Sequence, residues 1–160
     1  MYFLDNKFKS ILHFIINKYP LAEKEILFVI LYFIDFNYFE ANEKPLTGEI
    51  YIKKDFGVIP THFEIAIFEL IQEKKVAEFE KRKINSYSYS YKSIGKVDLY
   101  CLNQKEIMIA KEVCNKFLNY KKREVIRYLK GDMPWILSEI GNKLDYFDVF
   151  YRDLLYSVIF

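Results

Sequence analysis

The longest run of apolar residues in the chain extends from Ile26 to Ile34 and contains no charged side chain. A buried strand of this length is one alternative, but the segments on both sides, residues 22–25 and 37–41, favour a helix. The pattern therefore predicts a helix over residues 22–41. Because this helix would be apolar on every side, we expect it to occupy the centre of the domain.

Apolar residues at helical spacing predict further helices on both sides of this central one. Residues 8–16 and 61–74 each carry one apolar stripe, and Thr61 has the capping-box spacing to Glu64 at the start of the second stripe. Asn103 starts a later helix that continues to about residue 118, and short elements follow over residues 122–129 and from residue 132. A last helical stripe near the C-terminus consists of Phe147, Phe150, Tyr151, Leu154 and Leu155.

A turn, a short extended segment and a break occupy the middle of the sequence. Residues 45–48, with the sequence PLTG, are a turn signal, and residues 49–53 alternate between polar and apolar side chains. Gly57 and Pro60 then interrupt the pattern before the next helix. We expect Gly57 to be structural, with a backbone conformation or a close approach that a Cβ atom would obstruct.

The second extended region lies between the helices of residues 61–74 and those that begin at Asn103. Residues 76–83 and 96–102 are predicted as two antiparallel strands of one hairpin, with the Ser/Tyr-rich residues 85–95 as its long tip. No linker or repeat divides the sequence. Residues 1–160 are therefore predicted to form one α+β domain, mostly helical, around the central buried helix and with a small antiparallel hairpin sheet.

Composition and charge narrow the class of protein. Of the 160 residues, 52% are hydrophobic and 19% aromatic, which supplies a sizeable core and argues against disorder. The net charge of +2 does not suit a polybasic protein that coats nucleic acid or a membrane surface. Cys101 and Cys114 lack the spacing of zinc or disulfide frameworks. The longest apolar run falls well short of the roughly 20 residues that span a bilayer, and the N-terminus lacks a leader pattern, so we predict a cytoplasmic protein.

Candidate catalytic and metal-binding residues are few. Asp35 ends the most apolar run, where a catalytic acid or an ordinary residue at the edge of the core would both fit. His13 and His62 are the only histidines, and neither has a nearby histidine or cysteine with which to hold a metal ion. The sequence contains no phosphate-binding loop and no nucleophile elbow. We therefore predict no catalytic residues, no cofactor and no metal site.

Two aromatic features are candidates for contacts rather than for chemistry. Tyr87, Tyr89 and Tyr91 alternate with serines, so they either line a strand face on the core or form, with Lys92, an exposed surface for a partner protein. Both interpretations stay open at the level of the sequence. Trp135 follows a proline, an arrangement typical of a packing anchor for a turn.

Seven short motifs share their order and spacing with one known family. They are Leu31-Tyr32, Pro45-Leu46-Thr47-Gly48-Glu49, Tyr51-Ile52-Lys53, Phe56-Gly57, Ile59-Pro60-Thr61-His62-Phe63, Asp132-Met133-Pro134-Trp135 and Leu144-Asp145-Tyr146. In these motifs the chain resembles the Panacea domain, the family of SocA-like antitoxins and phage-associated proteins, over about residues 22–153. The motif residues expected to be structural are Leu46, Gly48, Gly57, Pro60, His62, Phe63, Pro134 and Trp135.

Two positions depart from the family's pattern. Val58 stands where the family usually has a proline, and Lys130 stands where a histidine commonly precedes the Pro-Trp pair. These differences bear on a polar site shared across the family, whereas the fold is expected to be retained.

The resemblance implies an antitoxin that binds and neutralises a cognate protein toxin encoded beside it. One member of the family is an adaptor that delivers its toxin to a protease, so a protease is an implied partner wherever that role applies. The alternative is a winged-helix-like DNA-binding transcriptional regulator, with residues 61–74 as recognition helix and residues 86–95 as wing. Glu64, Glu69 and Glu73 on that helix are a poor match to phosphate, so nucleic acid is not the expected partner. A hydrolase has no positive support in the sequence.

Overall fold

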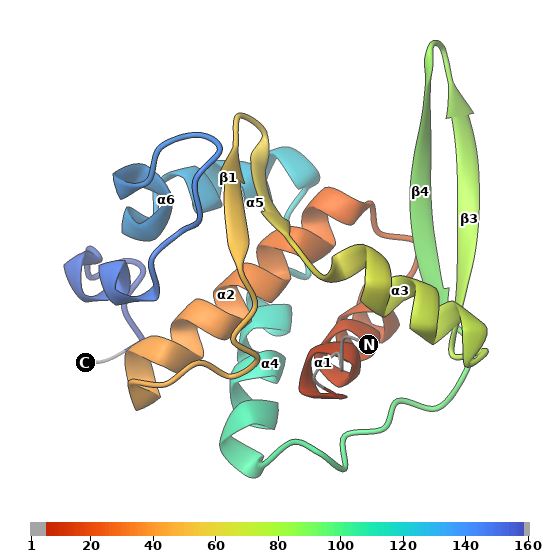
Figure 1. Ribbon diagram of the computed structural model, residues 1–160, viewed down its shortest axis with the longest axis horizontal. Coiled ribbons are helices and arrows are strands. Elements are labelled where there is room, and N and C mark those ends of the chain that lie inside the picture. The colour runs from red at the N-terminus through yellow and green to blue at the C-terminus, as the bar shows by residue number, and fades with distance from the viewer. Residues whose placement is uncertain (1–5, 159–160) are drawn as a thin grey trace.

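Helix α2 (Lys24–Asn42) crosses the middle of the molecule, and the other elements are arranged around it (Figure 1). The computed structural model describes residues 6–158. Residues 27–36 are buried without exception, and α2 contacts α1 (Asn6–Lys18), α4 (Gln104–Phe117) and α5 (Lys122–Lys130). The prediction of a central helix apolar on every side is confirmed.

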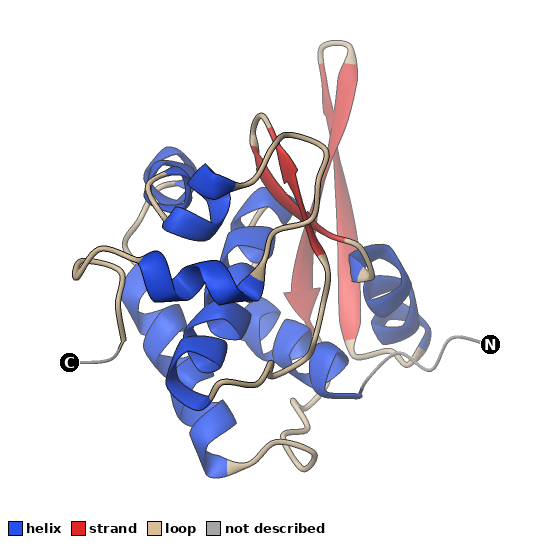
Figure 2. Ribbon diagram, turned by 60° about the vertical axis from the view of Figure 1, so that its left-hand side comes forward, coloured by secondary structure: helices blue, strands red, loops and turns tan. Residues whose placement is uncertain are grey.

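The remaining elements are two β-hairpins, two short helices and one 3-10 helix. In chain order they are β1 (Tyr51–Lys54), β2 (Gly57–Pro60), α3 (Phe63–Gln72), β3 (Val76–Lys83), β4 (Ser86–Ser93), α6 (Met133–Leu137) and the 3-10 helix η1 (Tyr146–Tyr151). Each hairpin is a separate two-stranded antiparallel sheet (Figure 2). A mostly helical α+β domain is therefore confirmed, with two small sheets in place of one.

The first hairpin forms where the sequence pattern predicted a break. Strand β2 pairs with β1 in the register Tyr51 opposite Pro60 and Lys54 opposite Gly57. Pro60 is tolerated because it ends the strand, where a missing backbone N–H interrupts nothing. Gly57 has a φ of +148°, which L side chains rarely adopt, so the predicted need for a special backbone conformation there is met. The hairpin packs against α2 through β2.

The second hairpin differs from the prediction in its second strand. The Ser/Tyr segment is not a loop tip: it is β4 itself, paired with β3 and joined to it by the two-residue turn Ile84–Asn85. Asn85 has a φ of +67°, a conformation that asparagine tolerates well. Residues 96–102, predicted as a strand, form a loop instead. Alternation of Tyr with Ser is a period-two pattern, and in this case that pattern indicates a strand.

The C-terminal stripe, predicted as helical, forms a helix over only part of its length. The chain forms only the short helix η1, in which Val149 is the buried residue. All five residues of the stripe are exposed: Phe147, Phe150, Tyr151, Leu154 and Leu155. The reason is that the segment turns so that Arg152, between the apolar positions, enters the interior.

Candidate functional site

Hairpin β3–β4 projects from the helical body (Figures 1 and 2). Its tyrosines are alternate residues of β4 and therefore share one face of the hairpin. Opposed residues of an antiparallel pair point to the same side, and Tyr87 lies opposite Arg82 while Tyr89 lies opposite Glu80. Exposure increases toward the turn: Tyr91 is buried, Tyr89 is half-buried and Tyr87 is 57% exposed. The interpretation as a strand face on the core therefore fits Tyr91, and the interpretation as an exposed surface fits Tyr87.

Tyr91 and Lys92 do not belong to the accessible tyrosine surface. The Tyr91 ring packs edge-on against Phe63 with 6.0 Å between ring centroids, and burial raises the pKa of its hydroxyl. Lys92 is exposed but lies opposite Ala77, on the other face of the hairpin. A contact role for Tyr91 is therefore corrected, because its side chain is part of the core.

Tyr87 and Tyr89 border a groove between β4 and the beginning of α2, which we name the β4–α2 groove. Its volume is about 410 Å³. It is lined by Glu23, Lys24, Glu25, Lys83, Ser86, Tyr87, Ser88, Tyr89 and Lys122. The loop before α2 covers the base of β4, where the Leu21 backbone N–H donates to the Tyr91 carbonyl at 2.8 Å. Further along β4, Ser90 bridges to Glu23, and beyond this point the strand becomes more exposed and the groove begins.

Charged side chains hold the walls of the β4–α2 groove in place. Lys24 Nζ lies 5.1 Å from the centroid of the Tyr89 ring and donates to Glu64 Oε1 at 2.8 Å. On the far wall, Lys122 Nζ donates to Glu23 Oε2 at 2.7 Å, and this hydrogen bond lowers the pKa of Glu23. The groove therefore offers an aromatic surface edged by charges of both signs, a composition that suits a protein partner.

Several family-motif residues of the Pro45 to Phe63 region form a hydrogen-bonded network around two buried carboxylates, Asp35 and Glu49. Asp35 accepts hydrogen bonds from Thr47 N at 2.9 Å, from Thr47 Oγ1 at 2.6 Å, and from the Tyr51 hydroxyl. Burial raises the pKa of the Asp35 carboxyl to about 6, against hydrogen bonds that lower it. Leu46 is buried beside this turn, and Gly48 has a φ of +73°. Asp35 thus holds the turn, and every polar contact it makes is structural.

Glu49 ties the same turn to the beginning of α3. Its Oε1 accepts from Thr61 Oγ1 at 2.8 Å, and its Oε2 accepts from the His62 backbone N–H at 2.8 Å. The predicted capping box at Thr61 is therefore wrong: the hydroxyl serves Glu49, and His62 is the N-cap residue of α3 without a side-chain cap bond. His62 Nδ1 lies 2.7 Å from Glu49 Oε1. Pro60 and Phe63, which flank Thr61 and His62 in the chain, are buried.

Trp135 links α6 to the first hairpin. Its indole Nε1 donates to the Gly57 carbonyl at 2.9 Å, and Lys53 Nζ lies 3.8 Å from the ring centroid. Lys53 also donates to the Trp135 carbonyl at 2.8 Å, while Pro134 is buried. The departure at Lys130 is accommodated here, since its Nζ lies 5.6 Å from the same ring. The half-buried Trp135 is a packing anchor in this structure.

A buried ionic network, which the sequence reasoning missed, fastens the C-terminal segment to α2. Arg152 Nη2 lies 2.7 Å from Asp132 Oδ2, and its Nη1 lies 2.9 Å from Glu40 Oε1. The Tyr32 hydroxyl donates to Asp132 Oδ2 at 2.8 Å, and Asn37 Oδ1 accepts from Arg152 Nη1 at 2.8 Å. The available signal was a pair of polar residues one helical turn apart near the end of the central helix, Asn37 and Glu40.

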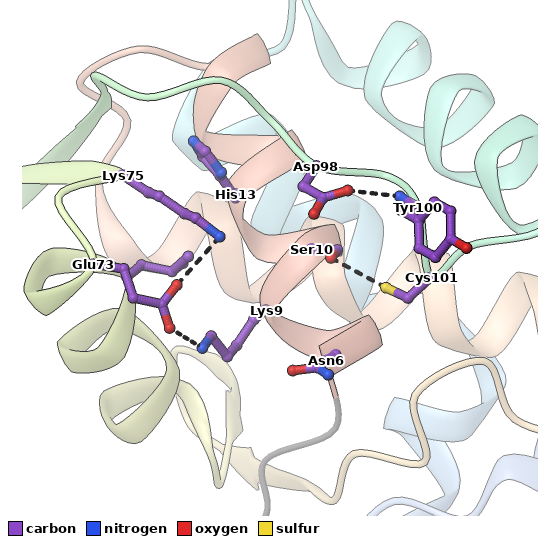
Figure 3. A pocket seen from close by; sticks show the side chains of 10 residues that line it. Asn6, Lys9, Ser10, His13, Glu73, Lys75, Asp98, Tyr100 and Cys101 are labelled. Atoms are coloured by element: carbon purple, nitrogen blue, oxygen red, sulfur yellow. Dashed lines mark hydrogen bonds and ion pairs between the residues drawn. The ribbon is translucent and has the colours of Figure 1, made fainter.

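A cavity of about 280 Å³ lies between α1, the end of α3 and the loop before α4 (Figure 3). It contains a histidine and a cysteine, but their polar atoms are engaged: His13 Nε2 is 2.8 Å from Ser93 Oγ, and Cys101 Sγ is 3.2 Å from Ser10 Oγ. Burial also lowers the pKa of His13. The geometry therefore supports a hydrogen-bonded contact between helix and loop and shows no pairing of His13 with Cys101.

Comparison with known proteins places this arrangement in a family. The family model described as antitoxin SocA-like, Panacea domain matches residues 27–136, which include most of α2, both hairpins, α3 and the Asp132–Trp135 motif. The chain belongs to this family. No curated protein and no solved structure matches it. Within residues 6–158, no helix is long and apolar enough to cross a membrane, and no group of three His, Cys, Asp or Glu side chains could hold a metal ion.

Proposed function

We propose that this protein is an antitoxin that neutralises a cognate protein toxin by binding it directly, with the β4–α2 groove as the contact surface. The observation that carries the proposal is the family match over residues 27–136. It acts in the cytoplasm, by stoichiometric binding and without catalysis. A role as adaptor for a protease is compatible with this mode of action, because an adaptor also works by binding.

The groove supports the proposal through the kind of residues it exposes. Tyr87 is 57% exposed, although it lies on the face that buries Tyr91 further down the strand. Tyrosine provides a large contact area at a low cost in conformational entropy, and it is enriched where protein interfaces are strongest. Lys24 stacks on Tyr89 and fixes that ring before a partner arrives, which reduces the entropy lost on binding.

A winged-helix regulator remains the competing function, because α3 followed by β3–β4 has the order of recognition helix and wing. The outward face of α3 does not favour DNA. It exposes Ile65, Phe68 and the Glu64 carboxylate, while Glu69 and the C-cap residue Glu73 are ion-paired with Lys9 of α1. A surface of exposed apolar and acidic side chains is suited to protein rather than to phosphate. DNA binding is accordingly an outcome that the experiment must be able to detect.

The test is co-expression with the protein encoded by the adjacent reading frame, followed by a growth assay and co-purification. We expect the adjacent protein to be toxic and this chain to rescue growth. The double variant Tyr87→Ala/Tyr89→Ala should bind at least about 30-fold more weakly, since each interface tyrosine can contribute about 2 kcal/mol. Tyr91 is left intact, because its truncation would test folding.

Tyr100→Ala is the matched control, since Tyr100 is 96% exposed on the loop before α4, away from the hairpin. It should rescue growth like the parent chain. Circular dichroism should show every variant folded at the assay temperature, although truncation of the half-buried Tyr89 lowers the melting temperature of the double variant. Full rescue of growth by the double variant would exclude the β4–α2 groove as the contact surface, while the proposed antitoxin function would stand. A harmless neighbour, combined with salt-sensitive binding of this chain to a specific DNA site, would contradict the antitoxin proposal itself.

A further inference from the structure

Strand β3 has one edge that pairs with nothing in residues 6–158. Strand β4 occupies its inner edge, and no backbone hydrogen bond reaches the outer edge over residues 78–83. All six of these residues are exposed. We refer to residues 78–83 as the β3 outer edge. An exposed row of backbone N–H and C=O groups is a ready template for another strand.

The hairpin has little support from the rest of the fold beyond its base. Strand β3 contacts α3 and strand β4 contacts α1, while the outer half of the hairpin extends past the helical body (Figure 1). A two-stranded hairpin is marginally stable by itself in water, whereas a sheet of four strands is much more stable. Ile84 is 94% exposed in the turn, where an isoleucine satisfies no conformational need.

The order of charges along β3 indicates what kind of strand would fit. The acidic residues Glu78 and Glu80 come first, and the basic residues Lys81, Arg82 and Lys83 follow. Among residues 6–158, none of the three basic side chains lies within ion-pair distance of a carboxylate. A uniformly acidic strand would attract the second half of β3 and repel the first. A strand with the same order of charges is complementary to both halves when it runs antiparallel.

From this complementarity we infer that β3 is a self-association edge and that its partner is β3 of a second copy of this chain. Antiparallel pairing about a two-fold axis at Lys81 places Glu80 opposite the Arg82 of the other copy, twice over. Opposed residues of opposite charge stabilise such a pair. The two Lys81 side chains also face one another, and their length lets both ammonium groups reach solvent. The product is a four-stranded sheet in the order β4-β3-β3-β4.

This pairing leaves the tyrosine wall of the β4–α2 groove open in both copies, since Lys83 is the one lining residue of the groove that lies on the β3 outer edge. Arg82 lies opposite Tyr87 within the hairpin and Glu80 lies opposite Tyr89, so the Glu80–Arg82 pairs form on the tyrosine face. A two-fold axis perpendicular to the sheet keeps both tyrosine faces on the same side. Self-pairing therefore does not depend on the identity of the toxin and can be tested without one.

The test is sedimentation equilibrium of the purified full chain over a series of concentrations, with Glu80 and Arg82 reversed one at a time. Glu80→Lys places like charges opposite each other in both pairs, and so does Arg82→Glu. Each variant alone should dimerise at least about tenfold more weakly than the parent. An equimolar mixture of the two variants restores attraction at both pairs and should form a mixed dimer.

Two further variants and additional measurements tie the outcome to the strand edge. Lys81→Ser removes the like-charge pair on the axis and should tighten the dimer. Lys92→Ser is the control: it lies on the same face of the hairpin but on β4, away from the β3 outer edge, and should leave the dimer unchanged. Hydrogen exchange should show β3 amides better protected in the dimer than in the monomer. Far-ultraviolet circular dichroism and melting curves of each variant separate loss of pairing from loss of folding.

Three results would overturn the inference. The first is a parent chain that stays monomeric at every concentration. The second is dimerisation that both charge reversals leave unaffected, which would place the interface elsewhere. The third is a mixture of the two reversed variants that fails to associate although each is folded, since the charge complementarity would then have no role.

Discussion

The indole Nε1 of Trp135 donates a hydrogen bond of 2.9 Å to the Gly57 carbonyl, between residues that lie 78 positions apart in the chain. The backbone of Gly57, with a φ of +148°, orients this carbonyl toward the indole. Lys53, on the paired strand, contacts both the Trp135 ring and the Trp135 carbonyl. Two family motifs thus meet in one contact, and this contact holds α6 on the first hairpin.

Substitution of Gly57 should destabilise the fold through the backbone. Gly57→Val is expected to lower the free energy of unfolding by roughly 1–3 kcal/mol, because a Cβ atom is strained at this φ. A Cβ atom would meet Leu129 Cδ2 at 3.4 Å, an ordinary contact, so space is not the limiting factor. Gly57→Ala should therefore lose most of the same energy in urea denaturation. A variant as stable as the parent would contradict the assignment.

Truncation of Trp135 should release α6 from the hairpin. Trp135→Ala is expected to cost about 3 kcal/mol, the lower end for a large aromatic residue, because the ring is half-buried. Trp135→Phe keeps most of the packing and loses the hydrogen bond to Gly57, for a loss of about 1 kcal/mol. Ile136→Ala, at the 47% exposed neighbour, should change the denaturant midpoint very little. Equal effects of Trp135→Ala and Ile136→Ala would exclude the anchoring role.

Stability should fall as the pH rises through the titration of Asp35. Its folded pKa of about 6 lies above the ordinary value of 3.8, so between these values the folded chain binds more protons than the unfolded chain. Raising the pH therefore removes up to about 3 kcal/mol of stability by pH 6 and above, and acid restores it. Asp35→Asn should flatten this dependence. Parallel pH profiles of the parent and of Asp35→Asn would show that Asp35 has no such role.

Removal of Arg152 should destabilise the chain more than any surface change. It is the buried cation between Asp132 and Glu40, so Arg152→Met leaves two buried carboxylates uncompensated and should cost about 3–5 kcal/mol. Arg152→Lys keeps the charge but not the fork that reaches both carboxylates, and an intermediate loss is expected. Arg127→Met, at an exposed position, is the control. Thermal unfolding would refute the network's importance if Arg152→Met and Arg127→Met behaved alike.

The central helix and the family could be predicted from the sequence because both depend on local pattern. Residues 27–36 of α2 are ten consecutive buried positions. Their burial follows from the apolar run in this helix, which leaves no polar face to turn toward water. The helix start predicted at Asn103 is likewise confirmed, because it depends on a capping box with Glu106, only three residues away. The motif residues around Gly57 and Trp135 could be recognised one motif at a time, before their contact was visible.

Only the tertiary structure determined which distant segments of the chain pack against one another. Tyr87, Tyr89 and Tyr91 have the same local pattern, yet the body of the protein covers Tyr91 and leaves Tyr87 exposed. Arg152 lies in a stripe that resembles a buried helix face, and its attraction to Asp132 and Glu40 turns the apolar side chains of that stripe outward. The physical reason is common to both. A periodic pattern fixes which residues share a face, but whether that face is buried depends on segments whose approach the pattern does not encode.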